Sequence, residues 1–100
     1  LDLSNFRTDN LKNTVNFYNI FYYCINLISL DLSNWNFSKI SIYHLGFNEI
    51  RNLENLKLSN AIFYDNIMSH LFENLYNIIS LNLSNFNSAN VEYMDYLFKI

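Results

Sequence analysis

Three side chains in this chain of 100 residues could form a nucleophilic or metal-binding centre: Cys24, His44 and His70. A cysteine becomes a catalytic nucleophile when the fold brings a histidine base within hydrogen-bonding reach. The histidines stand at unlike positions of the repeated units described below, His44 just after Tyr43 and His70 just before Leu71. We therefore expect neither to meet Cys24. No set of His, Cys or carboxylate side chains recurs at metal-ligand spacing, so we predict no metal and no cofactor.

Paired carboxylates are the other candidate chemistry, because two such groups can act as an acid–base couple. Asp2 and Asp31 occupy equivalent positions in two successive units and would project side by side. However, we expect them on an open surface, without a pocket to perturb either pKa, and Lys57 follows at the same position. Calcium binding would need more clustered oxygen ligands. The sequence thus predicts a solvated face and no enzyme.

A repeated pentapeptide sets the positions of all these residues. Leu-Xaa-Leu-Ser-Asn occurs four times, at residues 1–5, 30–34, 56–60 and 81–85, with spacings of 29, 26 and 25 residues. Units of this length cannot bury their own apolar face and must stack. We divide the chain into repeats at about residues 1–29, 30–55, 56–80 and 81–100, which form a single segment over residues 1–100. Because the chain starts inside a strand pattern and stops inside a helical one, we expect it to be part of a longer repeat protein.

Each unit carries a strand pattern followed by a helical one. Alternating apolar residues, with another apolar residue three positions upstream, predict strands near residues 1–3, 27–32, 53–58 and 78–83. Apolar residues at i, i+3 and i+4, such as Met94, Leu97 and Phe98, predict short helices near residues 14–23, 67–73 and 91–98. The predicted fold is an α/β solenoid like that of leucine-rich repeats, with one short parallel strand and one short helix in each of about four repeats.

The same alternation predicts two faces. The inward polar column is Asn5, Asn34, Asn60 and Asn85. Because a buried amide must be hydrogen-bonded, we interpret it as a structural ladder, with ligand binding as the alternative. The outward column is Asp2, Asp31, Lys57 and Asn82. Tyrosine is favoured in protein contacts, so we group Tyr22 and Tyr23 with this column as a candidate protein-contact face.

The composition narrows the choice of partners. The net charge of −3 comes from scattered residues with no basic run, which disfavours nucleic acid as a partner. No apolar stretch approaches the roughly 20 residues that span a bilayer, so we predict no direct membrane insertion by this segment. The lone Cys24 cannot form an internal disulfide.

Several columns together resemble a known repeat. The fourth unit, with residues 81–91 followed by Met94, Leu97 and Phe98, is similar to the repeat of the BspA-like leucine-rich repeat surface proteins, and the first unit agrees at residues 1–6, Cys24 and Leu27. The resemblance implies a secreted or cell-surface protein of a bacterium, or of a protist relative. In such proteins it implies adhesion to host proteins or to other cells.

Two functional hypotheses follow. The first is a non-enzymatic, extracellular module that binds a host or neighbouring-cell protein. The alternative is a structural spacer or assembly subunit whose surfaces contact adjacent chains of a larger complex.

Overall fold

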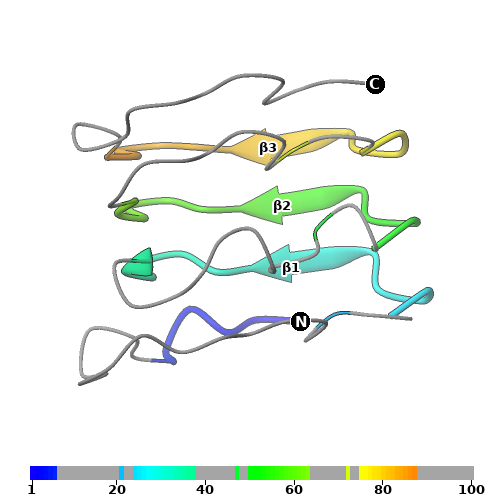
Figure 1. Cartoon of the computed structure of the whole chain (residues 1–100), viewed down its shortest axis with the longest axis horizontal. Helices are drawn as coiled ribbons and strands as arrows, with labels where there is room; N and C mark the ends of the chain where they lie inside the picture. The colour runs from blue at the N-terminus through cyan, green and yellow to red at the C-terminus, as the bar shows by residue number, and fades with distance from the viewer. Residues whose placement is uncertain are drawn as a thin grey trace.

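The computed structural model describes residues 1–6, 21, 24–37, 47, 50–63, 72 and 75–87. Three short strands form a parallel sheet in chain order: β1 (Ser29–Asp31), β2 (Asn55–Lys57) and β3 (Ser80–Asn82) (Figure 1). Leu30, Leu56 and Leu81 occupy the same level of the three strands. The predicted parallel pairing of successive pentapeptides is thereby confirmed for these three copies.

The first pentapeptide extends the same sheet edge. Asp2 forms a parallel bridge with Asp31, the last residue of β1. Backbone hydrogen bonds run from Asp31 N to Leu1 O at 2.9 Å and from Leu3 N to Asp31 O at 2.9 Å. In Figure 1 this N-terminal segment lies beside β1 on the side away from β2. All four copies therefore lie next to one another in the order of the chain.

The observed strands are shorter than the predicted ones, and the predicted helices fall largely outside the described residues. The predicted helix at residues 91–98 lies wholly outside them. Those at residues 14–23 and 67–73 overlap the described part only at Phe21 and Phe72, each of which lies in a turn. The described residues themselves include no α-helix.

Strand alternation accounts for the centre of the core. In an extended chain successive side chains point to opposite faces, so the two leucines of each pentapeptide share one face. Leu30 and Leu32, and their counterparts Leu56 and Leu58, are each at most 1% exposed. Complete burial of a leucine side chain contributes roughly 1.5–3 kcal/mol, so this face is a main source of stability.

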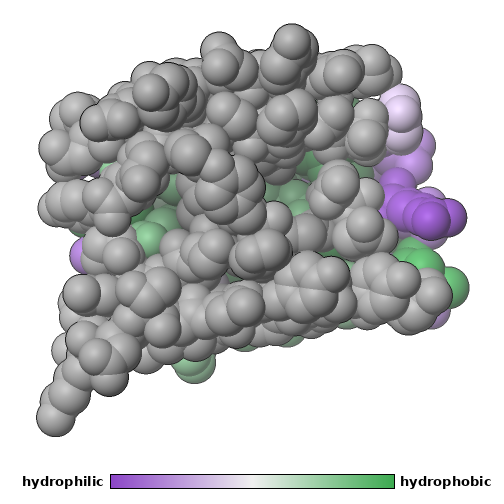
Figure 2. Space-filling model, in the orientation of Figure 1, coloured by the Kyte–Doolittle hydropathy of each residue, from purple (hydrophilic) through white to green (hydrophobic). Residues whose placement is uncertain are grey.

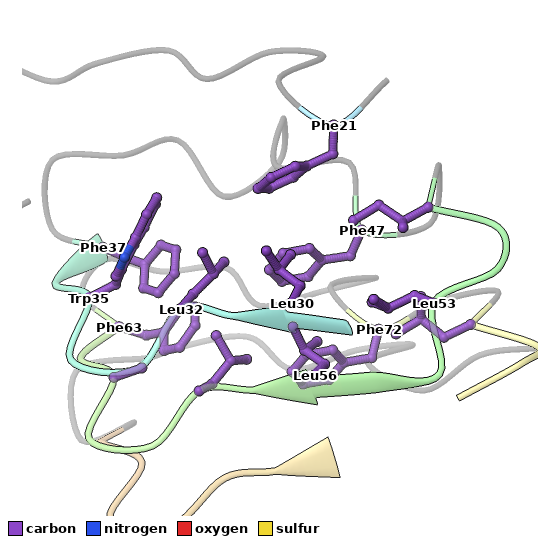
Figure 3. Packing of buried hydrophobic residues seen from close by; sticks show 14 residues of the cluster. Phe21, Leu30, Leu32, Trp35, Phe37, Phe47, Leu53, Leu56, Phe63 and Phe72 are labelled. Atoms are coloured by element: carbon purple, nitrogen blue, oxygen red, sulfur yellow. The ribbon is translucent and has the colours of Figure 1, made fainter. Parts of the chain in front are cut away.

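Two rows of aromatic rings extend the core on either side of these leucines (Figure 3). In one row Phe37 stacks on Phe63 with ring centroids 4.4 Å apart and planes at 10°, and Phe63 packs on Phe86 at 4.8 Å. In the other row Phe47 lies between Phe21 and Phe72, at 6.4 Å from each. Rings from successive units thus stack along the direction in which the strands pair.

Buried side chains also follow the strands. At the position after the pentapeptide Trp35 and Ala61 are buried, whereas Phe6 remains 49% exposed. Phe37 and Phe63, two residues after Trp35 and Ala61, are fully buried. The reason is a second set of parallel bridges, in which Ile62 pairs with both Asn36 and Asn87, so the chain becomes extended again and sends the next side chain inward.

Tight turns connect these extended parts. The amide of the residue after each pentapeptide donates to the carbonyl of its second leucine, as in Trp35 N to Leu32 O at 3.3 Å and Ala61 N to Leu58 O at 3.1 Å. Before the strands, the same kind of hydrogen bond occurs twice in the second unit, from Ile50 N to Phe47 O and from Leu53 N to Ile50 O, each at 3.0 Å. The apolar spacing of three residues here therefore matches successive hydrogen bonds of this kind.

Candidate protein-contact face

The polar residues of the strands form one continuous row on the face opposite the leucines. Asp2 pairs with Asp31, Asp31 with Lys57, and Lys57 with Asn82. We call these four residues the outer row. Because neighbouring strands lie about 4.8 Å apart, the row places two carboxylates, one ammonium group and one amide at regular intervals. The predicted outward column is thus brought together in the predicted order.

A hollow in the molecular surface follows this row. Its volume is about 420 Å³, and its lining residues come from the first three copies of the pentapeptide and from the residues just before the last three copies: Leu1, Asp2, Ser29, Leu30, Asp31, Asn55, Lys57 and Ser80. Most of the lining residues are polar, and a hydrogen bond from Asn55 Nδ2 to Ser29 Oγ at 3.2 Å connects the neighbouring strands β2 and β1. The face therefore offers charges and hydrogen-bonding groups on a concave surface.

Three members of the outer row close the turn that follows them. Asp31 Oδ1 accepts hydrogen bonds from Ser33 N at 2.9 Å and from Ser33 Oγ at 2.5 Å. Asn82 Oδ1 accepts the equivalent pair from Ser84 at 2.9 and 2.6 Å. Such Asx turns use a side-chain oxygen in place of a backbone carbonyl. The sequence prediction missed this role, although the recurrence of Asp or Asn two residues before Ser was a signal for it.

The same turn changes the acidity of Asp2. Its Oδ1 accepts from Ser4 Oγ at 2.6 Å and from Ser4 N at 2.8 Å. Hydrogen bonds to the charged form stabilise it, and they hold the pKa of the Asp2 carboxyl below its ordinary value. The positive charges of the chain's amino group and of Lys57 act in the same direction to a smaller extent. At neutral pH Asp2 is therefore an anion.

The inward asparagine column was assigned to the wrong face. Asn5, Asn34, Asn60 and Asn85 are all exposed. Asn34, Asn60 and Asn85 have positive φ values of 68°, 60° and 55°. They occupy the turn position at which a positive φ favours Gly or Asn, and this chain has a single glycine elsewhere. The recurrence of asparagine therefore reflects backbone conformation. One side-chain hydrogen bond also links neighbouring units here, in which Asn60 Nδ2 donates to Asn34 Oδ1 at 3.2 Å.

A second row of asparagines, in the residues that precede the strands, links neighbouring units. Asn52 Nδ2 donates to Ile25 O at 2.6 Å, and Asn77 Nδ2 donates to Arg51 O at 2.7 Å. Each amide thus bonds to a backbone carbonyl of the preceding unit. Asn26, Asn52 and Asn77 recur at spacings of 26 and 25 residues, so alignment of the units could have revealed this row.

The remaining candidate residues stay apart from the outer row or lie outside the described residues. Cys24 is a free thiol, half-buried and packed against the core. Tyr22, Tyr23, His44 and His70 lie outside the described residues. In the described ranges, no three His, Cys, Asp or Glu side chains gather as a metal site. No helix among those residues is long and apolar enough to cross a membrane.

Comparison with known proteins adds no identification. No family model, no curated protein sequence and no solved structure matches this chain.

Proposed function

We propose that this chain is a non-enzymatic protein-binding module, built as a leucine-rich-repeat solenoid of about four repeats in a protein of the cell surface. The observation that carries the proposal is the outer row, in which four successive pentapeptides place their variable residues side by side, and three of these residues, Asp2, Asp31 and Lys57, line the hollow. The leucine positions of the pentapeptide maintain the core, while the position between them changes from Asp to Lys to Asn. A scaffold of this kind keeps its backbone constant and varies the chemistry of its surface.

The resemblance of the repeat to BspA-like leucine-rich repeat proteins supports an extracellular location and a role in adhesion to host proteins or to other cells. The character of the face agrees with protein contact. It is open, mixed in charge and rich in hydrogen-bonding groups, as the polar parts of protein interfaces are. The two carboxylates of the outer row are held by serine in local turns, which favours a positioning role over proton transfer.

Surface display tests this proposal directly. The chain is displayed on a bacterium that does not itself adhere, and attached cells are counted on cultured cell layers and on layers first treated with protease. A second display with an unrelated domain of equal length is the control. Adhesion above the control that disappears after protease treatment supports a protein ligand. Adhesion no higher than the control contradicts the proposed function.

A separate observation favours the alternative role as an assembly subunit. Large apolar side chains are exposed just before the strands: Ile25 at 51%, Ile28 at 49%, Tyr76 at 69% and Ile79 at 78%. Figure 2 shows hydrophobic and hydrophilic surface side by side at this edge. Contacts with an adjacent chain would bury these residues. Sedimentation equilibrium of the wild type and of Ile79→Ser tests this role, which requires a concentration-dependent oligomer that the substitution weakens.

A further inference from the structure

Lys57 breaks a rule that the rest of the outer row obeys. At the equivalent position Asp2, Asp31 and Asn82 each accept two hydrogen bonds from the serine two residues later. A lysine ammonium group has no acceptor, so it cannot close this turn. In the described part of the chain, no other hydrogen bond from the N–H or hydroxyl group of Ser59 replaces the missing pair. The third unit thus gives up a local stabilising contact.

The surroundings of Lys57 indicate which role its side chain has in place of closing the turn. Its side chain is exposed and lines the hollow of the sheet face, with Asp31 next to it and Asp2 one strand further. Residues that break a local structural rule in an otherwise consistent fold tend to mark functional sites. Here the exception introduces the single positive charge of the outer row, in the middle of the concave face.

We propose that the outer row recognises an extended segment of a partner protein that carries a basic and an acidic side chain two residues apart. The basic side chain lies against Asp2 and Asp31, and the acidic one lies against Lys57. This inference rests on the proposed function and specifies the chemistry of its ligand. It follows from charge complementarity along the row, where two negative positions are followed by one positive position.

The dimensions of the row agree with this ligand. Residues two apart in an extended chain point to the same side and lie about 6.6 Å apart. In the outer row, Lys57 is one strand spacing from Asp31 and two from Asp2, or about 4.8 and 9.6 Å. A segment that crosses the strands therefore places its two charges within reach of both signs. Each exposed ion pair changes affinity by only about 1.5- to 5-fold, so the selectivity depends on both pairs together.

The residue at position 82 shows which substitution can remove a charge from the outer row and still allow the turn. Asn82 shows that an asparagine oxygen accepts the same two serine bonds as Asp31 does. Asp31→Asn therefore removes a charge without removing the acceptor, and Lys57→Asn removes a charge while supplying an acceptor for Ser59. Lys57→Arg is the matched control because it retains the positive charge.

Binding is measured with four synthetic heptapeptides of otherwise neutral, polar sequence. The first carries Arg and Glu two residues apart. In the second Gln replaces Arg, in the third Gln replaces Glu, and in the fourth Gln replaces both. Amide chemical shifts of the protein are followed during titration at low and at 150 mM salt. We expect the doubly charged peptide to bind best, with shifts at the strands of the outer row. Lys57→Asn and Asp31→Asn should each weaken its binding about 1.5- to 5-fold, and Lys57→Arg should not.

The outcomes separate this inference from the proposed function. If the neutral peptide binds as well as the doubly charged one, or if Lys57→Asn and Asp31→Asn bind it like the wild type, the charge-based recognition is wrong. Preference for the purely acidic or purely basic peptide also overturns it. The adhesion experiment is repeated with cells that display the wild type, Lys57→Asn or Asp31→Asn. Equal adhesion of all three to protein would agree with the proposed function and refute this ligand.

Discussion

An asparagine at residue 57 should make the protein more stable than a glutamine there, because asparagine restores a turn that the other three units possess. Within the residues that the structure describes, the Ser59 N–H and hydroxyl groups have no side-chain acceptor, whereas Ser4, Ser33 and Ser84 each donate twice to the residue two positions earlier. The backbone around Lys57 pairs in the same register as that around Asp31 and Asn82. An asparagine oxygen at residue 57 would therefore reach Ser59.

The size of the effect follows from opposing contributions. A hydrogen bond within the protein contributes about 0.5–1.5 kcal/mol net, and we count only the bond from the Ser59 N–H because its hydroxyl group can turn toward water. Asparagine is less favourable than lysine in a strand, on a scale that spans about 1 kcal/mol. Loss of the lysine charge also removes a weak attraction to the neighbouring carboxylates.

Lys57→Gln isolates the turn from these other contributions. Glutamine removes the same charge, but its amide is one methylene further from the backbone and does not form the Asx turn. We expect Lys57→Asn to be more stable than Lys57→Gln by about 0.5–1.5 kcal/mol, which corresponds to about 2–12 °C in melting temperature for a chain of this size.

Thermal and urea unfolding followed by circular dichroism measure this difference. The reciprocal substitution Asn82→Gln should lower stability by a similar amount, since it removes an existing acceptor. If Lys57→Asn is no more stable than Lys57→Gln, the side-chain turn contributes nothing to stability. Lys57 would then replace no stabilising contact, and its difference from the other units would not support a role in recognition.

Three further predictions concern the core, the turns and the acidity of the outer row. Phe63→Ala should cost about 3–5 kcal/mol in urea unfolding, because the ring is fully buried between two others, whereas Phe6→Ala at 49% exposure should cost clearly less; equal costs would contradict the packing. Asn60→Ala should be about 1 kcal/mol less stable than Asn60→Gly, since both lose the amide and only glycine tolerates a φ of 60° without strain, and an equal stability would exclude the turn explanation. The pKa of Asp2, measured by carboxyl-carbon NMR titration, should lie below the ordinary value of 3.8 and rise in Ser4→Ala. Because this pKa is lowered in the folded state, its contribution to stability is present above about pH 3.8 and is lost as the pH falls through the folded pKa, and Asp2→Asn should remove that dependence.

The sequence alone was sufficient to predict how the strands pair. The pentapeptide repeats at nearly constant spacing, and its alternating leucines can be buried only if equivalent residues stack. This requirement determined the parallel order of the strands and the register of Leu30 with Leu56 and Leu81. It also determined that the residues of the outer row lie side by side. It did so because a strand's side-chain period is two, so a shift of one residue would expose every leucine.

The tertiary structure decided what happens where the strand ends. Alternation predicts side-chain direction only while the backbone stays extended, and it stops at Leu32, where the chain turns. Beyond that point the rule placed Asn34 inside, although a positive φ turns it toward solvent. The rule also could not foresee that the chain would become extended again at Ile62 and bury Phe63. The second extended part depends on bridges between the units, from Ile62 to Asn36 and Asn87, and those bridges exist only once neighbouring units have stacked.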